Sequence, residues 1–363
     1  MHSVRLPLLV VAIVLCASPS LATTTTGWTE YAANPVYSPT GDRAYYPTVV
    51  LEGGTYRMWS DGSSSVNLAT SSDGINWATV SAVTGLTNPR HTLVENIGET
   101  YRIWYWNSGS LYSIKDIRTA TSTDGVAWTA DQVITQVGAT VINNASSSNW
   151  NRGSYGPADI LYNPSGSATL VEPIDEASVW ANRYVMYYDG TTGGDESLGL
   201  AVSNDGINWQ GYNGGVAPVL AGTGVSGDWD ADYVSRATVI KEHDDAYHMW
   251  YSGGLGSMDD GLGYAFSMDG IAWTRAGDPI FCVSDAIAWR DVRTYTPMVI
   301  GDEMWFTGRS SAGVYAVGYA TGGASPVPEP LSLLFFGTGL ACVAGFMARK
   351  RKRIQQKSPP IEA

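Results

Sequence analysis

The stretch Ser203-Asn204-Asp205-Gly206-Ile207-Asn208-Trp209 follows the pattern Ser-x-Asp-Gly-x-x-Trp, which this 363-residue chain contains four times. The other copies occupy residues 71–77, 122–128 and 267–273. Asp-Gly between strand-forming residues is a strong hairpin signal, because glycine tolerates positive φ and Asp hydrogen-bonds its own backbone. We interpret each copy as a turn with a structural Asp, followed by an apolar side chain that packs in the core. Its recurrence indicates a repeat architecture.

A second phrase, of the type Tyr-x-Met-Trp, occurs five times with some variation. It covers residues 56–59, 101–104, 184–187, 247–250 and 302–305. Apolar and aromatic residues that alternate with polar ones are typical of strands. Together with the Asp-Gly hairpin, each unit predicts a four-stranded propeller blade of roughly 40–50 residues. The expected fold class is all-β, a five-bladed β-propeller, with six blades as the alternative.

The two ends of the repeat region predict how the ring closes. The fifth unit has no Asp-Gly-x-x-Trp segment of its own. Near the N-terminus, Trp28-Thr29 followed by Asn34-Pro35 parallels Trp273-Thr274 followed by Asp278-Pro279 in the fourth unit. We expect the N-terminal strand to complete the last blade, which would remove an exposed sheet edge.

Both termini are predicted to be targeting segments. Arg5 precedes an apolar run, and Ser20-Leu21-Ala22 suits a signal-peptidase cleavage site. A second apolar stretch near the C-terminus is just long enough to span a bilayer, and the basic residues after it would stay in the cytoplasm. The predicted division is a signal peptide at 1–22, the propeller at 23–323, a linker at 324–330, a transmembrane helix at 331–348 and a cytoplasmic tail at 349–363.

The linker contains Val327-Pro328-Glu329-Pro330. This motif, with the apolar helix and basic end that follow it, resembles the bacterial PEP C-terminal sorting signal. The resemblance implies secretion across the inner membrane, an exosortase-type enzyme as a processing partner, and release to the cell surface after tail cleavage. The alternative is a plain anchor that keeps the protein in the membrane through its C-terminal helix.

The net charge of the chain and the spacing of its potential metal ligands argue against some classes of function. The formal net charge is −13, which disfavours nucleic acid as a partner because such binding depends on positive patches. The segment Asp228-x-Asp230-x-Asp232 resembles a calcium loop, but Tyr233 stands where that loop needs Gly and Val239 where it needs Glu. The sequence identifies no particular cofactor, and we leave open whether a structural cation lies in the channel.

The two repeated phrases, together with Leu262-Gly263-Tyr264-Ala265, resemble the five-bladed propeller glycosidases of glycoside hydrolase families 43 and 32. The resemblance covers about residues 28–323. It implies that a carbohydrate or exopolysaccharide binds at one mouth of the central channel. It also implies carboxylates at the starts of the innermost strands, an Asp in each of the first two blades and a Glu in the third. Such enzymes need one carboxyl group to protonate the leaving oxygen and one to attack or to activate water.

This chain matches that acid pattern only in part. Asp42 lies before the inner strand of the first blade, Asp159 takes the place of the Glu in the third, and the second blade has no acid near Arg90. The candidate catalytic residues are therefore Asp42, Asp159 and Asp232, on the hypothesis that catalysis has moved within the channel. The plainer interpretation of Asp42 is a turn residue beside Gly41.

Basic and aromatic residues on the same strands are candidates for substrate binding. Arginines from three blades would favour an anionic ligand, as in sialidases, whose Asp-boxes resemble the repeat but have one more residue between Asp and Gly. The alternative is that each arginine pairs with a neighbouring Asp and braces the channel. Aromatic rings at the mouth would stack on sugar faces. The candidates are Arg90, His91, Arg236, Arg293, Tyr46 and Trp229.

Three functional hypotheses follow from these residues. The first is a surface-delivered glycosidase that hydrolyses an extracellular polysaccharide. The second is a non-catalytic propeller that binds a glycan or organises the envelope. The third is sialidase-like recognition of an anionic sugar.

Overall fold

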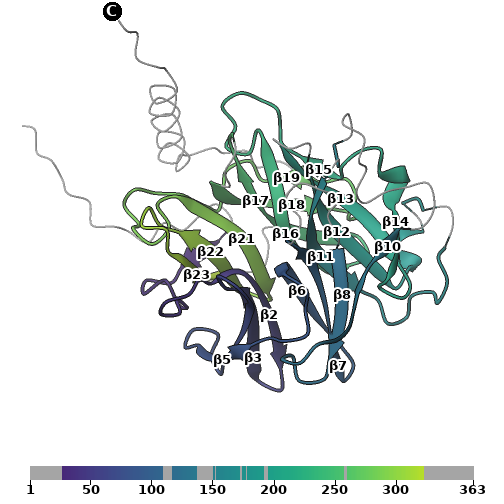
Figure 1. Ribbon diagram of the computed structural model, residues 1–363. Coiled ribbons are helices and arrows are strands. Elements are labelled where there is room, and N and C mark those ends of the chain that lie inside the picture. Colours follow the sequence, from purple (N-terminus) through teal and green to yellow (C-terminus); the bar gives the residue numbers. More distant parts are fainter. Residues whose placement is uncertain are drawn as a thin grey trace, which may run out of the picture.

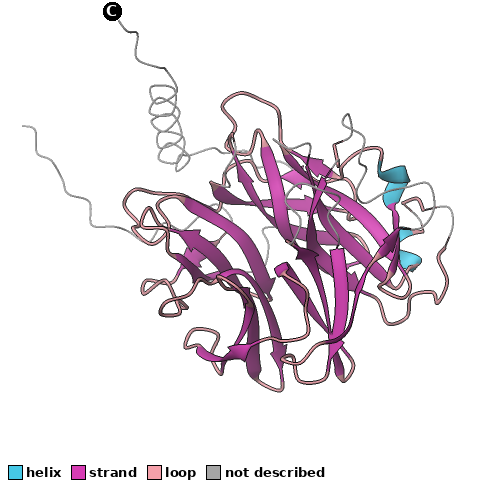
Figure 2. Ribbon diagram, viewed as in Figure 1, coloured by secondary structure: helices cyan, strands magenta, loops and turns pink. Residues whose placement is uncertain are grey.

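The computed structural model describes residues 27–108, 117–136, 150–151, 153–171, 174–176, 178–191, 195–256 and 260–322. This part of the chain is built of strands, with two short 3₁₀ helices, η1 (Val179–Ala181) and η2 (Tyr212–Gly215) (Figure 2). Within it, no helix has the length and apolar character needed to cross a membrane. The predicted signal peptide, sorting motif and C-terminal helix lie outside these residues and stay predictions.

Two sheets are four-stranded antiparallel meanders with the strands in chain order. Meander 1 consists of β2 (Tyr45–Glu52), β3 (Thr55–Asp61), β4 (Val66–Ser71) and β5 (Ala78–Ala82). Meander 2 consists of β6 (Pro89–Ile97), β7 (Thr100–Asn107), β8 (Ile117–Ser122) and β9 (Thr129–Val133).

A larger sheet contains two further meanders. Meander 3 consists of β11 (Gly153–Tyr162), β12 (Tyr184–Thr191), β13 (Glu196–Ser203) and β14 (Asn208–Gly211). Meander 4 consists of β16 (Tyr233–His243), β17 (Ala246–Gly254), β18 (Gly261–Ser267) and β19 (Thr274–Arg275). One bridge, between Glu196 and Tyr233, joins them. Three short strands extend this sheet: β10 (Thr135–Gln136) pairs with β14, β15 (Leu220–Ala221) with β13, and β20 (Phe281–Cys282) with β18.

The last sheet combines the two ends of the described chain. Its order is β1-β23-β22-β21, where β1 is Trp28–Glu30, β21 is Arg293–Ile300, β22 is Glu303–Arg309 and β23 is Tyr315–Gly322. Strand β1 pairs antiparallel with β23, with Trp28 opposite Gly322. The N-terminal strand therefore covers what would otherwise be the exposed edge of this sheet, meander 5.

The first strands of the five meanders contact one another in a cycle. Strand β2 contacts β6, β6 contacts β11, β11 contacts β16, β16 contacts β21, and β21 contacts β2. In Figure 1 these five strands lie toward the middle of the molecule, and the other strands fan outward from them. This arrangement brings the starts of five strands, far apart in sequence, to one place.

The two repeated phrases meet where neighbouring meanders pack. The indole N–H of Trp104, in β7, donates to the carbonyl oxygen of Gly206 in the hairpin of the next meander at 2.9 Å. Equivalent bonds join Trp59 to Gly125, Tyr187 to Gly270 and Trp305 to Gly74. The strand phrase thus supplies the donor and the hairpin phrase the acceptor.

The Asp residues of the hairpin phrase are structural, as expected. Asp205 accepts the backbone N–H groups of Ile207 and Asn208 at 2.7 Å through its Oδ1 atom. Ser203 donates its hydroxyl to the same oxygen. The acidic side chain therefore holds the turn together, and the interpretation of the repeat as a turn is confirmed.

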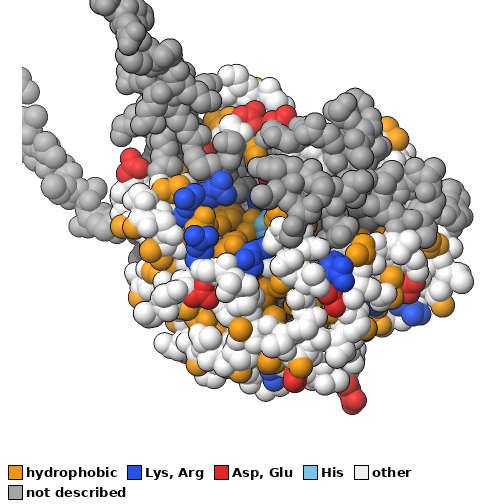
Figure 3. All heavy atoms as spheres, in the orientation of Figure 1, with side chains coloured by type: hydrophobic (Ala, Val, Ile, Leu, Met, Phe, Trp, Pro, Cys, Tyr) orange, Lys and Arg blue, Asp and Glu red, His pale blue; other side chains and the backbone are white. Residues whose placement is uncertain are grey.

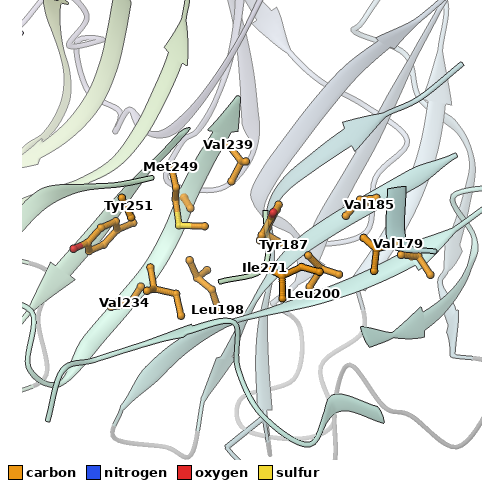
Figure 4. Close-up of a cluster of buried hydrophobic side chains, with 14 of the residues drawn as sticks. Val179, Val185, Tyr187, Leu198, Leu200, Val234, Val239, Met249, Tyr251 and Ile271 are labelled. Carbon is orange, nitrogen blue, oxygen red and sulfur yellow. The ribbon is translucent and has the colours of Figure 1, made fainter. Parts of the chain in front are cut away.

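The core lies between adjacent sheets. Figure 4 shows one cluster between meanders 3 and 4, in which Tyr187 and Leu200 face Val239 and Met249. Another set of large rings packs on paired glycines within a sheet, where a Cβ atom would overlap the ring. These pairings are Trp150 on Gly190 and Gly199, Trp229 on Gly253 and Gly263, and Trp289 on Gly308 and Gly318.

Candidate functional site

Each of the five innermost strands has a residue with positive φ close to its start. These residues are Tyr46 (55°), His91 (50°), Gly156 (116°), Arg236 (49°) and Thr296 (53°). Each lies at a β-bulge, where the pairing register with the second strand shifts. Positive φ is uncommon outside glycine and is an outlier for a β-branched residue such as threonine. Strained backbone of this kind clusters at functional sites, which makes these five strand starts a candidate site.

The neighbouring meander holds these residues in place. The strained residue donates its backbone N–H to a side chain near the end of the preceding second strand. His91 donates to Asp61 at 2.8 Å, Arg236 to Asp189 at 2.8 Å, Thr296 to the hydroxyl of Ser252 at 2.8 Å, and Tyr46 to the hydroxyl of Thr307 at 3.1 Å. The same bonds that link the meanders therefore fix the unusual backbone.

These strand starts enclose a pocket with about 400 Å³ of empty space, part of which opens to solvent. Its lining comes from all five innermost strands. It consists of residues 46–48, 91–93, 157–158, 236–238 and 296–298, together with Asp189. The pocket is thus lined by the same five strands that contact one another in a cycle.

One wall of the pocket is a stack of flat side chains. The Tyr46 and His91 rings are stacked with centroids 3.9 Å apart, and the His91 ring lies 5.1 Å from that of Trp106. On the other side, the Arg236 guanidinium lies 5.2 Å from the centre of the Tyr46 ring. The result is an aromatic surface with a cation at one end.

The structure places three of the six predicted binding residues in this pocket: Tyr46, His91 and Arg236. Arg236 also pairs with Glu196, with Nη1 3.1 Å from the carboxylate oxygen Oε2. This ion pair agrees in part with the alternative hypothesis, in which each arginine pairs with an acidic residue and stabilises the surrounding strands. Arg90 and Arg293 lie outside the lining.

Arg90 and Arg293 are each held by local contacts. Arg90 donates to the carbonyl oxygens of Pro89 and Ser63 at 2.8 and 2.9 Å. The guanidinium of Arg293 lies 5.7 Å from the centre of the Tyr295 ring.

Trp229 lies away from the pocket. It is 8% exposed, stacks on Tyr251 with ring centroids 5.8 Å apart, and donates its indole N–H to the carbonyl oxygen of Gly277. A ring that is packed between a tyrosine and two strand glycines has no free face for a sugar. Its position is explained by packing within meander 4.

Asp42 lies in the turn before β2. Its carboxylate accepts the backbone N–H groups of Arg43 and Ser63 and the amide of Asn67. Burial acts to raise the pKa of Asp42, but these hydrogen bonds outweigh it and lower the pKa to about 2. The group is ionised at neutral pH and fully engaged in the turn, as the plainer interpretation expects.

Asp159 lies in β11 and is 8% exposed. Its two oxygens accept the backbone N–H groups of Val239 in β16 and of Ile160. Burial raises the pKa of Asp159 to about 7. In this position it links two innermost strands, as the hydroxyl of Thr48 does when it donates to the carbonyl oxygen of Thr92 at 2.6 Å.

Glu95, in β6, is a carboxyl group that the sequence did not single out. Burial raises the pKa of Glu95 to about 8, and the nearby charge of Asp159 adds to the rise. Both side chains belong to innermost strands, but neither lines the pocket. Asp232 is also outside the lining, and accepts the backbone N–H of Gly256 at 2.7 Å.

Among the residues that the structure describes, Asp189 is the one acidic residue that lines the pocket. Its side chain is buried and accepts the N–H of Arg236. Within the same described ranges, no group of three or more His, Cys, Asp or Glu side chains is placed to hold a metal ion. Within the described residues, the pocket lining thus contains one carboxyl group, whereas glycoside hydrolysis needs two.

The strained positions themselves were missed from the sequence, although a signal was present. Proline follows the strained residue in three of the five strands, at Pro47, Pro157 and Pro297. Proline inside a strand marks a bulge or an edge, because it cannot donate to the ladder. Three such prolines in equivalent repeat positions could have identified the strand starts that line the pocket.

No known family model and no curated protein sequence matches the chain. The similarity is to solved structures. A thermostable family-43 glycoside hydrolase has a TM-score of 0.56 at 14% identity, with 82% of this chain and 99% of that chain covered.

Two further structures are similar. One is described under the heading that the GH130 family of mannoside phosphorylases contains glycoside hydrolases that target β-1,2 mannosidic linkages in Candida mannan. Its TM-score is 0.55 at 17% identity, and the match covers 84% of this chain and 97% of that chain. The other is a glycosyl hydrolase from Bacteroides ovatus, with a TM-score of 0.55 at 15% identity and coverage of 81% and 93%. The chain therefore has an all-β, propeller-type fold like that of glycoside hydrolases.

Proposed function

We propose that this chain is an exported, five-bladed propeller that binds an extracellular carbohydrate at the mouth of its channel. In this proposal each meander is one blade, and the pairing of β1 with β23 closes the ring. The cycle of contacts between the five innermost strands supports five blades. The signal-peptide pattern at 1–22 and the PEP-type segment from 324 support delivery across the inner membrane, exosortase-type processing, and a position in the membrane or on the cell surface.

The strained backbone around the pocket is the observation that carries the binding function. Four non-glycine residues hold positive φ at equivalent strand starts, and all four line the pocket. Backbone strain costs of order 1–3 kcal/mol per residue, so its concentration at one concave site favours a role in recognition. The Tyr46 ring is only partly buried and gives the pocket lining an aromatic surface that a sugar can contact. The glycoside hydrolase-like neighbours are consistent with a carbohydrate ligand.

Binding is favoured over hydrolysis because the candidate carboxylates are engaged elsewhere. Asp42 and Asp159 each accept at least two backbone N–H groups, and Asp232 accepts one. An acid–base pair also needs two carboxyl groups that face one bound substrate, and none of the three candidates lines the pocket.

The test measures binding and hydrolysis with the full chain purified in detergent. Titration against mannan, xylan and polygalacturonate should reveal binding to at least one, and Tyr46→Ala should weaken it about tenfold through loss of an aromatic contact in the pocket. The control is Tyr31→Ala, because Tyr31 is an exposed tyrosine next to β1 and outside the pocket lining. New reducing ends that disappear in Asp159→Asn would show catalysis and contradict a binding-only role.

A further inference from the structure

Arginines gather around tyrosines at the strand starts beside the pocket. The guanidinium groups of Arg43 and Arg309 lie 5.2 and 5.3 Å from the centre of the Tyr315 ring. Arg43 precedes β2, Arg309 is the last residue of β22, and Tyr315 is the first of β23. One tyrosine ring therefore carries two cations that come from different segments.

A chain of ring contacts connects this group to the pocket. Tyr315 lies 5.0 Å from Tyr45, and Tyr45 lies 5.2 Å from Tyr46. Tyr46 also contacts Tyr295 at 5.7 Å, and the guanidinium of Arg293 lies over the Tyr295 ring. The cations and the pocket thus share one aromatic wall.

We name Arg43, Arg90, Arg293 and Arg309 the arginine rim. Arg90 belongs to it because it is the second residue of β6, one position before His91 of the pocket. On the face that Figure 3 presents, several Lys or Arg side chains gather around hydrophobic and histidine side chains.

Two members of the rim, Arg43 and Arg309, form no ion pair in the described part of the chain. Arg90 differs from them, because its charge acts on the buried Asp61 and opposes the rise that burial causes in the pKa of that carboxyl group. The buried Nε atom of Arg309 also has no hydrogen-bond partner among those residues. Elsewhere arginines are neutralised, as Arg118 is by Asp131 and Arg290 by Glu30.

Unneutralised arginines are unexpected in this protein. Its formal net charge is −13, so acidic side chains are plentiful, and yet none in the described ranges forms an ion pair with Arg43 or Arg309. Neighbouring cations repel one another, and a bound anion removes that cost. Arg43 and Arg309 therefore have the electrostatics of an anion site that the described residues do not fill.

We propose that the arginine rim binds the anionic groups of an acidic polysaccharide, one of whose sugar rings occupies the pocket. The proposal rests on the carbohydrate-binding function proposed above and names its substrate class. Guanidinium groups match carboxylates and sulfate esters through paired hydrogen bonds. Their positions over tyrosine rings restrict the side chains before the ligand arrives, so less conformational entropy is lost on binding. A flat membrane would reach the rim but not the pocket beside it.

The test uses matched pairs of charged and neutral polymers with the full chain in detergent. Polygalacturonate is compared with its methyl ester, and dextran sulfate with dextran. We expect at least one charged member to bind about tenfold more tightly than its neutral partner, with affinity that falls as ionic strength rises. The pair that shows the preference identifies the anionic group as carboxylate or sulfate.

Variants then locate the preference. Arg43→Gln combined with Arg309→Gln should abolish the preference for the charged polymer and leave binding of the neutral one unchanged. Arg57→Gln is the matched control, because Arg57 lies 5.8 Å over the Tyr101 ring and near the opposite end of its blade. Arg309→Lys keeps the charge but not the planar guanidinium group. Its preference for the charged polymer should lie between that of the unmodified protein and that of the double variant. This variant also tests the proposal if the double variant is unstable.

The outcomes separate the two proposals. Equal affinity for charged and neutral polymers, or an equal loss in Arg57→Gln, overturns the arginine rim and leaves carbohydrate binding intact. Tighter binding to phosphatidylglycerol vesicles than to any polysaccharide also overturns it. Absence of binding to every glycan, charged or neutral, contradicts the proposed function itself.

Discussion

At the residue scale, the strained positions of the innermost strands differ in how replaceable they are. Gly156 has φ of 116°, which L residues rarely adopt, and an added Cβ atom would lie 3.2 Å from the Cβ of Trp106 and 3.7 Å from that of His91. We expect Gly156→Ala to reduce the free energy of unfolding by about 1–3 kcal/mol and to disturb the Trp106–His91 contact. Urea denaturation measures the first effect, and glycan affinity the second.

The control for that substitution is Gly98→Ala. Gly98 also has positive φ, at 73°, but an added Cβ atom would meet nothing within 4 Å among the described residues. The substitution should lower the free energy of unfolding by about 1 kcal/mol, because alanine is disfavoured at positive φ, and it should leave glycan affinity unchanged. Equal costs for the two variants would show that the crowding around Gly156 is unimportant.

Side-chain type at the strand starts singled out Tyr46, His91 and Arg236, which line the pocket. The same criterion also singled out Arg90 and Arg293, which lie outside the lining. The sequence was less informative for carboxylates. Asp159 was assigned to catalysis by its position in the third unit, whereas its oxygens accept N–H groups of two strands, one of them 80 positions away in the chain. A hydrogen bond over that separation leaves no local pattern.

At the element scale, the bond between a strand tryptophan and its neighbour's hairpin joins adjacent meanders. Trp104 is fully buried and donates to the carbonyl oxygen of Gly206 at 2.9 Å. Trp104→Phe removes that donor and part of the ring, so we expect a loss of about 2–4 kcal/mol in unfolding free energy. Trp128→Phe is a matched control, because Trp128 is 3% exposed and its indole nitrogen has no hydrogen-bond partner in the described ranges.

The difference between these two variants isolates the hydrogen bond. Trp104→Phe should be the more costly by about 1–2 kcal/mol, because the Gly206 carbonyl loses its partner in a buried site. Calorimetry at one pH is sufficient for the comparison. Losses of the same size would mean that ring volume alone joins the meanders.

The repeats also show which element features a sequence can reveal. Both repeated phrases were found because each is a contiguous pattern, and together they predicted strands and hairpins at the correct places. The packing of Trp229 on Gly253 and Gly263 was not found. Glycine usually signals a turn, and only the paired strands bring these two glycines beneath one ring. Trp229 was therefore assigned to the channel mouth when it belongs to the core.

At the scale of the whole molecule, the carboxyl groups held between blades make stability depend on pH. Burial raises the pKa of Asp61 and Asp159 to about 7 and, together with the charge of Asp159, that of Glu95 to about 8. In the unfolded chain such groups titrate near 4. Between pH 4 and 8 the folded state therefore binds more protons than the unfolded state, so stability must fall as pH rises.

We expect the free energy of unfolding to be lower at pH 8 than at pH 5.5, by on the order of 1 kcal/mol for each group that ionises. Glu95→Gln, which mimics the protonated group, should reduce this difference. Asp42→Asn is the control: hydrogen bonds outweigh burial and lower the pKa of Asp42 to about 2, so its carboxylate is charged at both pH values. That variant should lose the same stability at pH 5.5 and at pH 8. If Glu95→Gln leaves the pH dependence of urea denaturation unchanged, the Glu95 carboxyl is not protonated in the folded protein, and the channel between the blades is wetter than its packing indicates.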